Sequence, residues 1–393
     1  MTGQSTAAIA PLLQAGFAQQ QKGQLGQARA LYAQGLEIDR HNFDALQLSG
    51  LCALQTGNNA AALAFLDRAL GLRQDVASVF NHRGVARRRL GQADAALADF
   101  SRVITLDPRS ADAFYNRVNA LRELGRHRDA LVDYRRATEL APRRIDLLNN
   151  LGGCLKELSL HAEALGCYDR LLELNPLSAE GHSNRSLVLQ HLGRFDKALA
   201  SAETATTLSP DFADAWRERA AALPALGRPE EALECTGKAL AINPGHAASA
   251  ATGGMALMEL GRPEEAAVSF EHALSLKTGY VEARLGLAKL ASEQGDFSGV
   301  EALFEAMRRD EPSNIGSLHE LSGVCKFKAG DPLFDAIAER PRDTALTPEP
   351  REQLHHGDAK ISNDAGLSDK AKAHFAISKA CRPEGGWTVF RSR

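Results

Sequence analysis

The 393-residue sequence contains 46 Lys and Arg against 49 Asp and Glu, which gives a formal net charge of −3 at pH 7. A chain so close to neutrality has no overall field favouring nucleic acid or an anionic membrane, so we expect neither as a partner. No stretch approaches the ~20 apolar residues of a membrane span, and the start, MTGQSTAAIAPLLQ, lacks the basic leader and apolar core of a secretion signal.

The six cysteines are scattered along the sequence and form no C-x-x-C pair. They are Cys52, Cys154, Cys167, Cys235, Cys325 and Cys381. This pattern is typical of small core residues in a reducing compartment and not of a disulfide framework or a zinc site. We therefore expect a cytoplasmic protein without a bound metal.

Residues 111–144 show the unit from which most of the chain is built. Apolar residues from Ala113 to Leu124 recur at the spacing of one helical face, which predicts a helix that ends at Gly125. A second amphipathic helix follows and is closed by Pro142, because proline has no N–H to extend the hydrogen-bond ladder. The unit is therefore a pair of helices.

Shifting the sequence by 34 residues superimposes this pattern repeatedly. A small residue of the second helix recurs as Ala28, Ala62, Ala96, Ala130, Ala164, Ala198, Ala232 and Ala266. One helical turn later a large residue recurs as Tyr32, Leu66, Phe100, Tyr134, Tyr168, Phe270 and Phe304. Such helix pairs cannot bury their apolar faces alone, so the period predicts an all-α solenoid of stacked repeats.

The pattern resembles the tetratricopeptide repeat, which has a period of about 34 residues, and Trp216 stands where that family's consensus places its tryptophan. The resemblance implies a right-handed superhelix that binds proteins or peptides. Nine repeats are expected within 9–314, at 9–42, 43–76, 77–110, 111–144, 145–178, 179–212, 213–246, 247–280 and 281–314.

The remaining segments flank this array. Residues 1–8 are expected to form a polar leader, 315–351 a helical linker, 352–385 a degenerate helix pair and 386–393 a tail. Inside the array, repeats six and seven place Ala202 and Thr236 where other repeats have a large residue, and Pro224 lies within a predicted first helix. We expect these two repeats to pack less tightly.

Positions 2, 5, 6, 9, 12 and 13 of each first helix share one face, which lines the concave side of such solenoids. Position 6 carries His82, Asn116, Asn150 and Asn184. Each amide both donates and accepts, so three in succession predict a ladder that pairs with an extended peptide backbone. The alternative is that asparagine simply fits the repeat there and is solvated. His82 is expected to be an exposed polar residue.

Position 12 supplies Arg88, Arg122 and Lys156. A basic inner wall would suit acidic peptides, whereas the alternative is an exposed face that keeps the helices soluble. The family's carboxylate clamp needs lysine and asparagine at positions 5 and 9. Repeat seven offers Arg217 and Ala221 instead, so that partner class is not expected.

The sequence contains no phosphate-binding loop, dinucleotide fingerprint or nucleophile elbow, so we expect no catalytic residue and no cofactor. The favoured function is a non-catalytic scaffold that binds protein or peptide segments.

Residues 330–341 and 354–382 resemble the linker that follows the repeats in bacterial tetratricopeptide sulfotransferases. The matching residues are Leu354, His355, Ala359, Lys360, Asp364, Gly366, Ala371 and His374. This resemblance implies an alternative function, the substrate-binding portion of a protein sulfotransferase. The family's donor-binding P-R-S-G-T-like loop would follow such a linker, and the sequence ends at Arg393 before it. A third alternative, an array associated with a glycosyltransferase, fits this linker less well.

Overall fold

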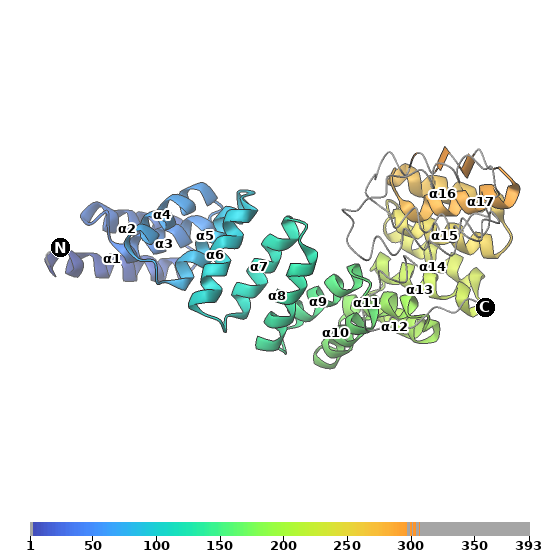
Figure 1. Ribbon diagram of the computed structural model, residues 1–393, viewed down its shortest axis with the longest axis horizontal. Helices are drawn as coiled ribbons and strands as arrows, with labels where there is room; N and C mark the ends of the chain where they lie inside the picture. Colours follow the sequence, from blue (N-terminus) through green and yellow to red (C-terminus); the bar gives the residue numbers. More distant parts are fainter. Residues whose placement is uncertain (1–2, 297–298, 301, 304–305, 307–393) are drawn as a thin grey trace, which may run out of the picture. The chain divides into compact units, whose positions relative to one another are not determined.

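The structure is a computed structural model that describes residues 3–296, 299–300, 302–303 and 306. Every regular element in these residues is a helix, seventeen of them α-helices (Figure 1). The predicted linker (315–351), degenerate pair (352–385) and tail (386–393) lie outside the described residues. The all-α repeat architecture expected from the period is confirmed.

The chain forms two units, Met1–Asn184 and Arg185–Arg393, and their boundary falls within α11. The helices of unit 1 are α1 (Gly3–Gln21), α2 (Leu25–Ile38), α3 (Phe43–Gln55), α4 (Asn59–Leu72), α5 (Ala77–Arg89), α6 (Ala93–Leu106), α7 (Ala111–Glu123), α8 (His127–Leu140), α9 (Ile145–Glu157), α10 (His161–Leu174) and the start of α11 (Ala179–His191). Helix α1 begins at Gly3 and therefore includes residues 3–8 of the predicted leader.

The helices of unit 2 after α11 are α12 (Phe195–Leu208), α13 (Ala213–Ala222), the 3-10 turn η1 (Pro224–Leu226), α14 (Pro229–Ile242), α15 (Ala247–Glu259), α16 (Pro263–Leu276) and α17 (Val281–Gln294). Helix α13 has 10 residues, whereas α15 has 13. It ends before Pro224, which starts the tighter turn because it cannot donate the next helical hydrogen bond. Ala202 and Thr236 are nevertheless buried.

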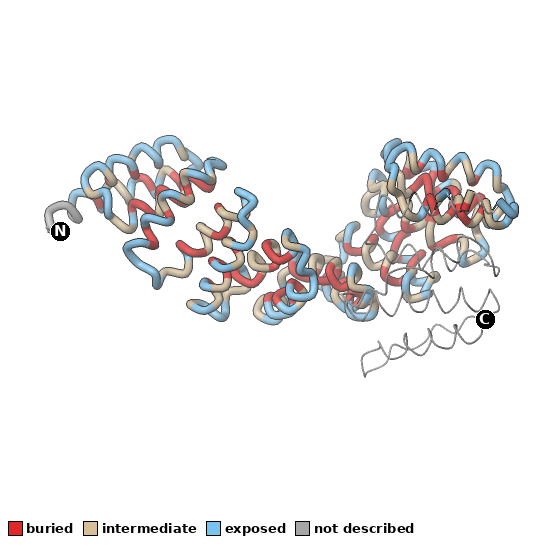
Figure 2. Tube along the Cα trace, turned by 45° about the horizontal axis from the view of Figure 1, so that its top comes forward, coloured by how far each residue is buried: buried red, intermediate tan, exposed pale blue. Residues whose placement is uncertain are grey.

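Within each unit, helices that follow one another in the chain pack together, as α1 does with α2 and α13 with α14, and first helices also contact one another across repeats. Such contacts join α1 to α3, α3 to α5 and α5 to α7 in unit 1, and α13 to α15 and α15 to α17 in unit 2. The first helices therefore line one face of each unit. Buried residues follow the sides of the helices that face their neighbours (Figure 2).

Small and large residues meet in the core as the repeat pattern predicts. Phe100 is fully buried beside α5, where a Cβ added to Gly84 would lie 2.6 Å from the Phe100 ring. A side chain at position 84 would therefore displace the ring, and this close approach accounts for glycine at that place.

The turn between the two helices of a repeat needs a residue with positive φ. Gly125 takes φ 70° after α7, in agreement with its predicted role as a helix stop. The same place in the next repeat is held by Ser159 at φ 59°, the only non-glycine residue with positive φ in the described part of the chain. Repeat five thus adopts the common turn with an unfavourable residue.

Candidate functional site

The three predicted amides of unit 1 make the same hydrogen bond in successive repeats. In each case the side-chain Nδ2 at position 6 donates to a side-chain oxygen at position 5 of the preceding repeat, 35 residues earlier. The bonds run from Asn116 to Asn81 Oδ1 (2.8 Å), from Asn150 to the Tyr115 hydroxyl (3.0 Å) and from Asn184 to Asn149 Oδ1 (3.1 Å). We call these three bonds the amide ladder.

The amide ladder fixes how each asparagine lies on the first-helix face. All six side chains that form these bonds are half-buried. An amide has two N–H donors and one acceptor oxygen, so each bond occupies one donor. The sequence predicted the amides but not their partners, although acceptors recur at position 5 with the same 34-residue period.

His82 differs from the asparagines at the same repeat position. The ring is half-buried, and its buried Nδ1 has no hydrogen-bond partner among the described residues. Burial lowers the pKa of His82, because a low-dielectric surrounding disfavours the charged ring. His82 therefore presents a neutral imidazole at pH 7 and is less exposed than the sequence suggested.

The three predicted position-12 cations have different surroundings. Arg88 Nη1 lies 2.7 Å from Glu123 Oε1 of the next repeat, so its charge is compensated. Arg122 is exposed and lies beside Tyr134, where its charge opposes the burial that raises the pKa of Tyr134. Lys156 is half-buried in the last turn of α9. Among the described residues, no hydrogen bond or ion pair joins these cations to the amide ladder.

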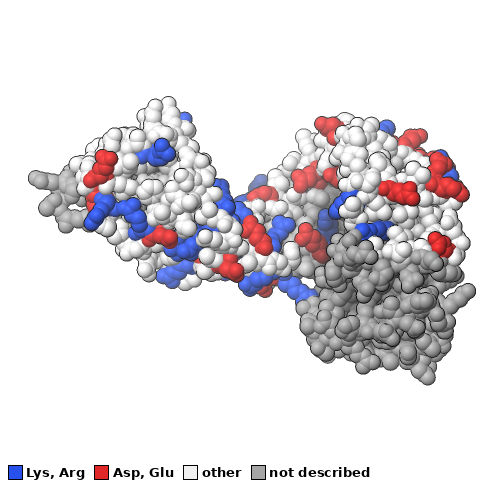
Figure 3. Space-filling view, turned by 90° about the horizontal axis from the view of Figure 1, so that it is seen from above, with Lys and Arg blue, Asp and Glu red and all other residues white. Residues whose placement is uncertain are grey.

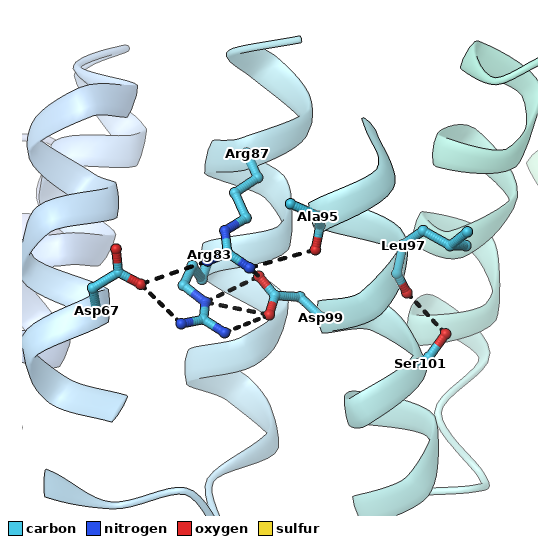
Figure 4. Close-up of polar contacts among 7 residues, drawn as sticks. All are labelled: Asp67, Arg83, Arg87, Ala95, Leu97, Asp99 and Ser101. Atoms are coloured by element: carbon cyan, nitrogen blue, oxygen red, sulfur yellow. Dashed lines mark hydrogen bonds and ion pairs between the residues drawn. The ribbon is translucent and has the colours of Figure 1, made fainter. Parts of the chain in front are cut away.

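Much of the arginine content of repeats three and four is used inside the array. Arg83 Nη1 lies 2.8 Å from Asp67 Oδ1, and its Nη2 lies 2.6 Å from Asp99 Oδ1. Arg87 Nη1 contacts the other Asp99 oxygen at 2.9 Å, as Figure 4 shows. Asp99 is only 2% exposed, so these contacts supply the positive charge that a buried carboxylate requires.

The next repeat contains a similar arrangement. Arg117 Nη2 lies 2.6 Å from Asp133 Oδ1, and its Nη1 donates to Ser101 Oγ at 3.3 Å. On the face drawn in Figure 3, basic and acidic side chains are interleaved along the described repeats. These ion pairs were not predicted from the sequence, although Arg83 and Arg117 are 34 residues apart, as are Asp99 and Asp133.

Each unit has a hollow on its first-helix face. In unit 1 a hollow of about 380 Å³ lies between α1 and α3 and includes Leu13, Phe17 and Leu48. In unit 2 a hollow of about 420 Å³ is lined chiefly by repeats seven and eight. Repeat seven contributes positions 5 and 9 from α13 and positions 12 and 13 from η1, and repeat eight contributes positions 2, 5, 6, 9 and 13 from α15. These are positions that the sequence assigned to the inner face.

The described residues offer little for covalent or metal chemistry. No group of three His, Cys, Asp or Glu side chains in this part of the chain could hold a metal ion. The four described cysteines are free, and burial raises the pKa of each thiol, that of Cys167 to about 11. None of the described helices is both long and apolar enough to cross a membrane.

Two profiles of the tetratricopeptide repeat match the chain. One matches residues 20–81 and 257–322, and the other matches 83–145, 115–179, 155–211 and 184–247. Together these matches cover most of the sequence. The chain therefore belongs to the tetratricopeptide repeat proteins.

Solved structures resemble parts of the chain at low sequence identity. A tetratricopeptide repeat protein from Parabacteroides merdae is 18% identical with a TM-score of 0.50, over 68% of this chain and 97% of that one. YrrB, described as having an unusual peptide-binding site, is 24% identical with a TM-score of 0.43, over 47% and 95%. TTC0263 from Thermus thermophilus is 23% identical with a TM-score of 0.44, over 46% and 98%. No curated protein sequence matches the chain.

Proposed function

We propose that this chain is a non-catalytic scaffold whose unit 1 binds an extended, acidic polypeptide segment along Asn116, Asn150 and Asn184. The observation that carries the proposal is the amide ladder, in which one hydrogen bond recurs in three successive repeats. A recurring, anchored polar group on the first-helix face suits a ligand that also repeats, and a polypeptide backbone is such a ligand.

The remaining amide groups supply the recognition chemistry. Each asparagine retains a second N–H and its carbonyl oxygen, which can pair with a backbone C=O and N–H whatever the side chains of the segment. Because the ladder already orients each amide, binding costs less side-chain entropy. Arg122 and Lys156 favour acidic side chains through charge-assisted hydrogen bonds, and Arg88 contributes less because Glu123 compensates it. The described cysteines of the chain are free, which suits a reducing compartment, so we propose that the scaffold works in the cytoplasm.

The test is the binding of a fluorescein-labelled peptide of alternating Glu and Ser, about 12 residues long so that it can span roughly 40 Å. Fluorescence anisotropy should show about a tenfold weaker Kd for the triple variant N116A/N150A/N184A than for the unaltered chain. Tyr115→Phe is the matched control, because it removes the acceptor of the Asn150 bond and keeps the Asn150 amide. An unchanged Kd in the triple variant would refute the ladder as a binding site.

A second candidate function is the substrate-binding portion of a protein sulfotransferase. Its support is the linker-like sequence in residues 330–341 and 354–382, which lies outside the described residues. The DNA that follows the codon for Arg393 tests it: a frame encoding a P-R-S-G-T-like loop would support this candidate, and an unrelated gene would count against it. An array associated with a glycosyltransferase is a third candidate with less support from this linker.

A further inference from the structure

The hollow of unit 2 combines apolar lining residues with the charged side chains of Arg217, Glu259 and Glu282. Small residues such as Ala221 and Ala251 leave the space between α13 and α15 unfilled. Met255 lines the hollow and is 42% exposed, whereas Leu257 of the same helix is buried. Tyr280 borders the same space. An apolar side chain entering the hollow would cover this exposed surface.

The only cation lining the hollow among the described residues is already compensated. Arg217 contacts the carboxylate of Glu218, which is 2% exposed, and its Nε lies 4.0 Å from Asp214 Oδ1. His246 Nε2 lies 3.2 Å from that same Asp214 oxygen. The positive charge of Arg217 is therefore directed toward neighbouring carboxylates and is largely unavailable to a ligand.

Two carboxylates that line the hollow remain available. Glu259 and Glu282 are exposed, and neither makes an ion pair with any described residue. Glu259 is the last residue of α15, whereas Glu282 lies in the first turn of α17, level with the opposite end of α15. Eleven helical residues separate these two levels along the axis, which corresponds to about 16 Å. About five residues of extended polypeptide span that distance.

We propose that this hollow binds a basic segment of another protein, in which one apolar residue is flanked on both sides by Lys or Arg. The apolar side chain packs against Met255 and Tyr280, and the flanking cations pair with Glu259 and Glu282. The acidic rim excludes nucleic acid and other polyanions. This site uses other side chains than the amide ladder and prefers the opposite ligand charge, so either site can fail without the other.

The probe is a fluorescein-labelled peptide of about nine residues with one Leu between two Lys and Ser elsewhere, titrated with the full chain carrying N116A/N150A/N184A, so that the amide ladder does not bind an acidic peptide. The same peptide with Glu for Lys is the charge control. We expect the Lys peptide to bind and the Glu peptide to bind at least about tenfold more weakly to this site. Equal affinity for the two peptides would overturn the proposal, as would the absence of Lys-peptide binding.

Two double variants with the same change in net charge locate the site. E259Q/E282Q should weaken Lys-peptide binding about tenfold, because losing each exposed ion pair with the peptide should raise the Kd about threefold. E234Q/E271Q removes two exposed carboxylates from the second helices α14 and α16 and should leave the Kd unchanged. An equal loss in both variants would show a general charge effect and overturn the assignment.

A third variant tests the apolar contact. Met255→Lys places a cation in the hollow at an exposed position, so folding is preserved. The new charge repels the Lys side chains of the peptide, and the loss of Met255 removes the apolar contact with its Leu. Lys-peptide binding should fall below detection, and unchanged binding would overturn the proposal. The alternating Glu and Ser peptide used for unit 1 should bind Met255→Lys and the unaltered chain equally, which separates a local effect from unfolding.

Discussion

Arg83 and Asp99 form a two-point ion pair, with Nε 3.0 Å from Oδ2 and Nη2 2.6 Å from Oδ1. Through its Nη1 the same guanidinium also reaches Asp67, so one side chain on α5 connects α4 with α6. Asp99 is 2% exposed, whereas the Asp67 side chain is 46% exposed. The two carboxylates therefore differ in burial while they share one cation.

Replacing the buried acid should cost far more stability than replacing the exposed one. Asp99→Ala leaves Arg83 and Arg87 without their buried counter-charge, and we expect the free energy of unfolding to fall by about 3 kcal/mol. Asp67→Ala should cost below about 1 kcal/mol. Urea unfolding followed by circular dichroism measures both, and equal losses would show that Asp99 burial has no energetic consequence.

Adjacent glycines on α9 should respond in opposite directions to alanine. A Cβ at Gly152 would lie 2.7 Å from the Tyr168 ring, whereas a Cβ at Gly153 would meet nothing within 4 Å. We expect Gly152→Ala to destabilise the chain by about 1–3 kcal/mol through overpacking. Gly153→Ala should stabilise it by about 0.5–1 kcal/mol because alanine favours the helix. Thermal unfolding distinguishes them, and the same sign for both would contradict the close approach.

Ser159→Gly should stabilise repeat five. Ser159 holds φ 59° at a turn where Gly125 and Gly193 serve the neighbouring repeats. A left-handed conformation costs a non-glycine residue about 1–2 kcal/mol, part of which is offset by the greater chain entropy of glycine, so a net gain of about 0.5–1 kcal/mol is expected. The reverse change, Gly125→Ser, should lose a similar amount in repeat four. A lower melting temperature for Ser159→Gly would argue against strain at this turn.

The lowered pKa of His82 predicts a dependence of stability on pH. At pH values below the ordinary histidine pKa of 6.5, His82 binds a proton in the unfolded chain but resists protonation in the folded chain. Stability therefore falls as pH decreases from about 6.5 toward the lower pKa of the folded state. His82→Asn, which introduces the residue of the next repeats, should reduce the loss of urea midpoint between about pH 7 and pH 5. His41→Asn changes an exposed histidine and serves as the control. Identical pH profiles for unaltered chain and His82→Asn would refute the prediction.

Hydrogen exchange should be faster within 200–240 than within 100–170. Helix α13 stops at Ala222 and Pro224 removes a helical hydrogen bond, while Ala202 and Thr236 replace the large residue of other repeats. Fewer large apolar contacts lower the cost of local opening. Amide exchange monitored by mass spectrometry compares the two ranges, and similar protection in both would mean that repeats six and seven pack as tightly as the others.

The helix pairs could be predicted because small and large apolar residues recur at helical spacing, and this spacing indicates which face of a helix is buried. Ala96 and Phe100, one helical turn apart, are both buried as this pattern predicts. The buried role of Asp99 was missed, since a charged residue in a sequence reads as exposed until its partner is known. The pairing of Arg88 with Glu123 depends on side-chain rotamers and could not be read from spacing. The positive φ of Ser159, by contrast, could have been anticipated from its alignment with Gly125.

The amide ladder gives the array a direction, because each position-6 amide depends on the repeat before it and not on the one after. Duplication of a complete 34-residue unit that carries both Asn149 and Asn150 would recreate the same donor and acceptor at the new junction. Deletion of such a unit would bring the position-6 amide of the following repeat next to the position-5 acceptor of the preceding one. The number of anchored amides can thus change by whole units during evolution while every other side chain keeps its place.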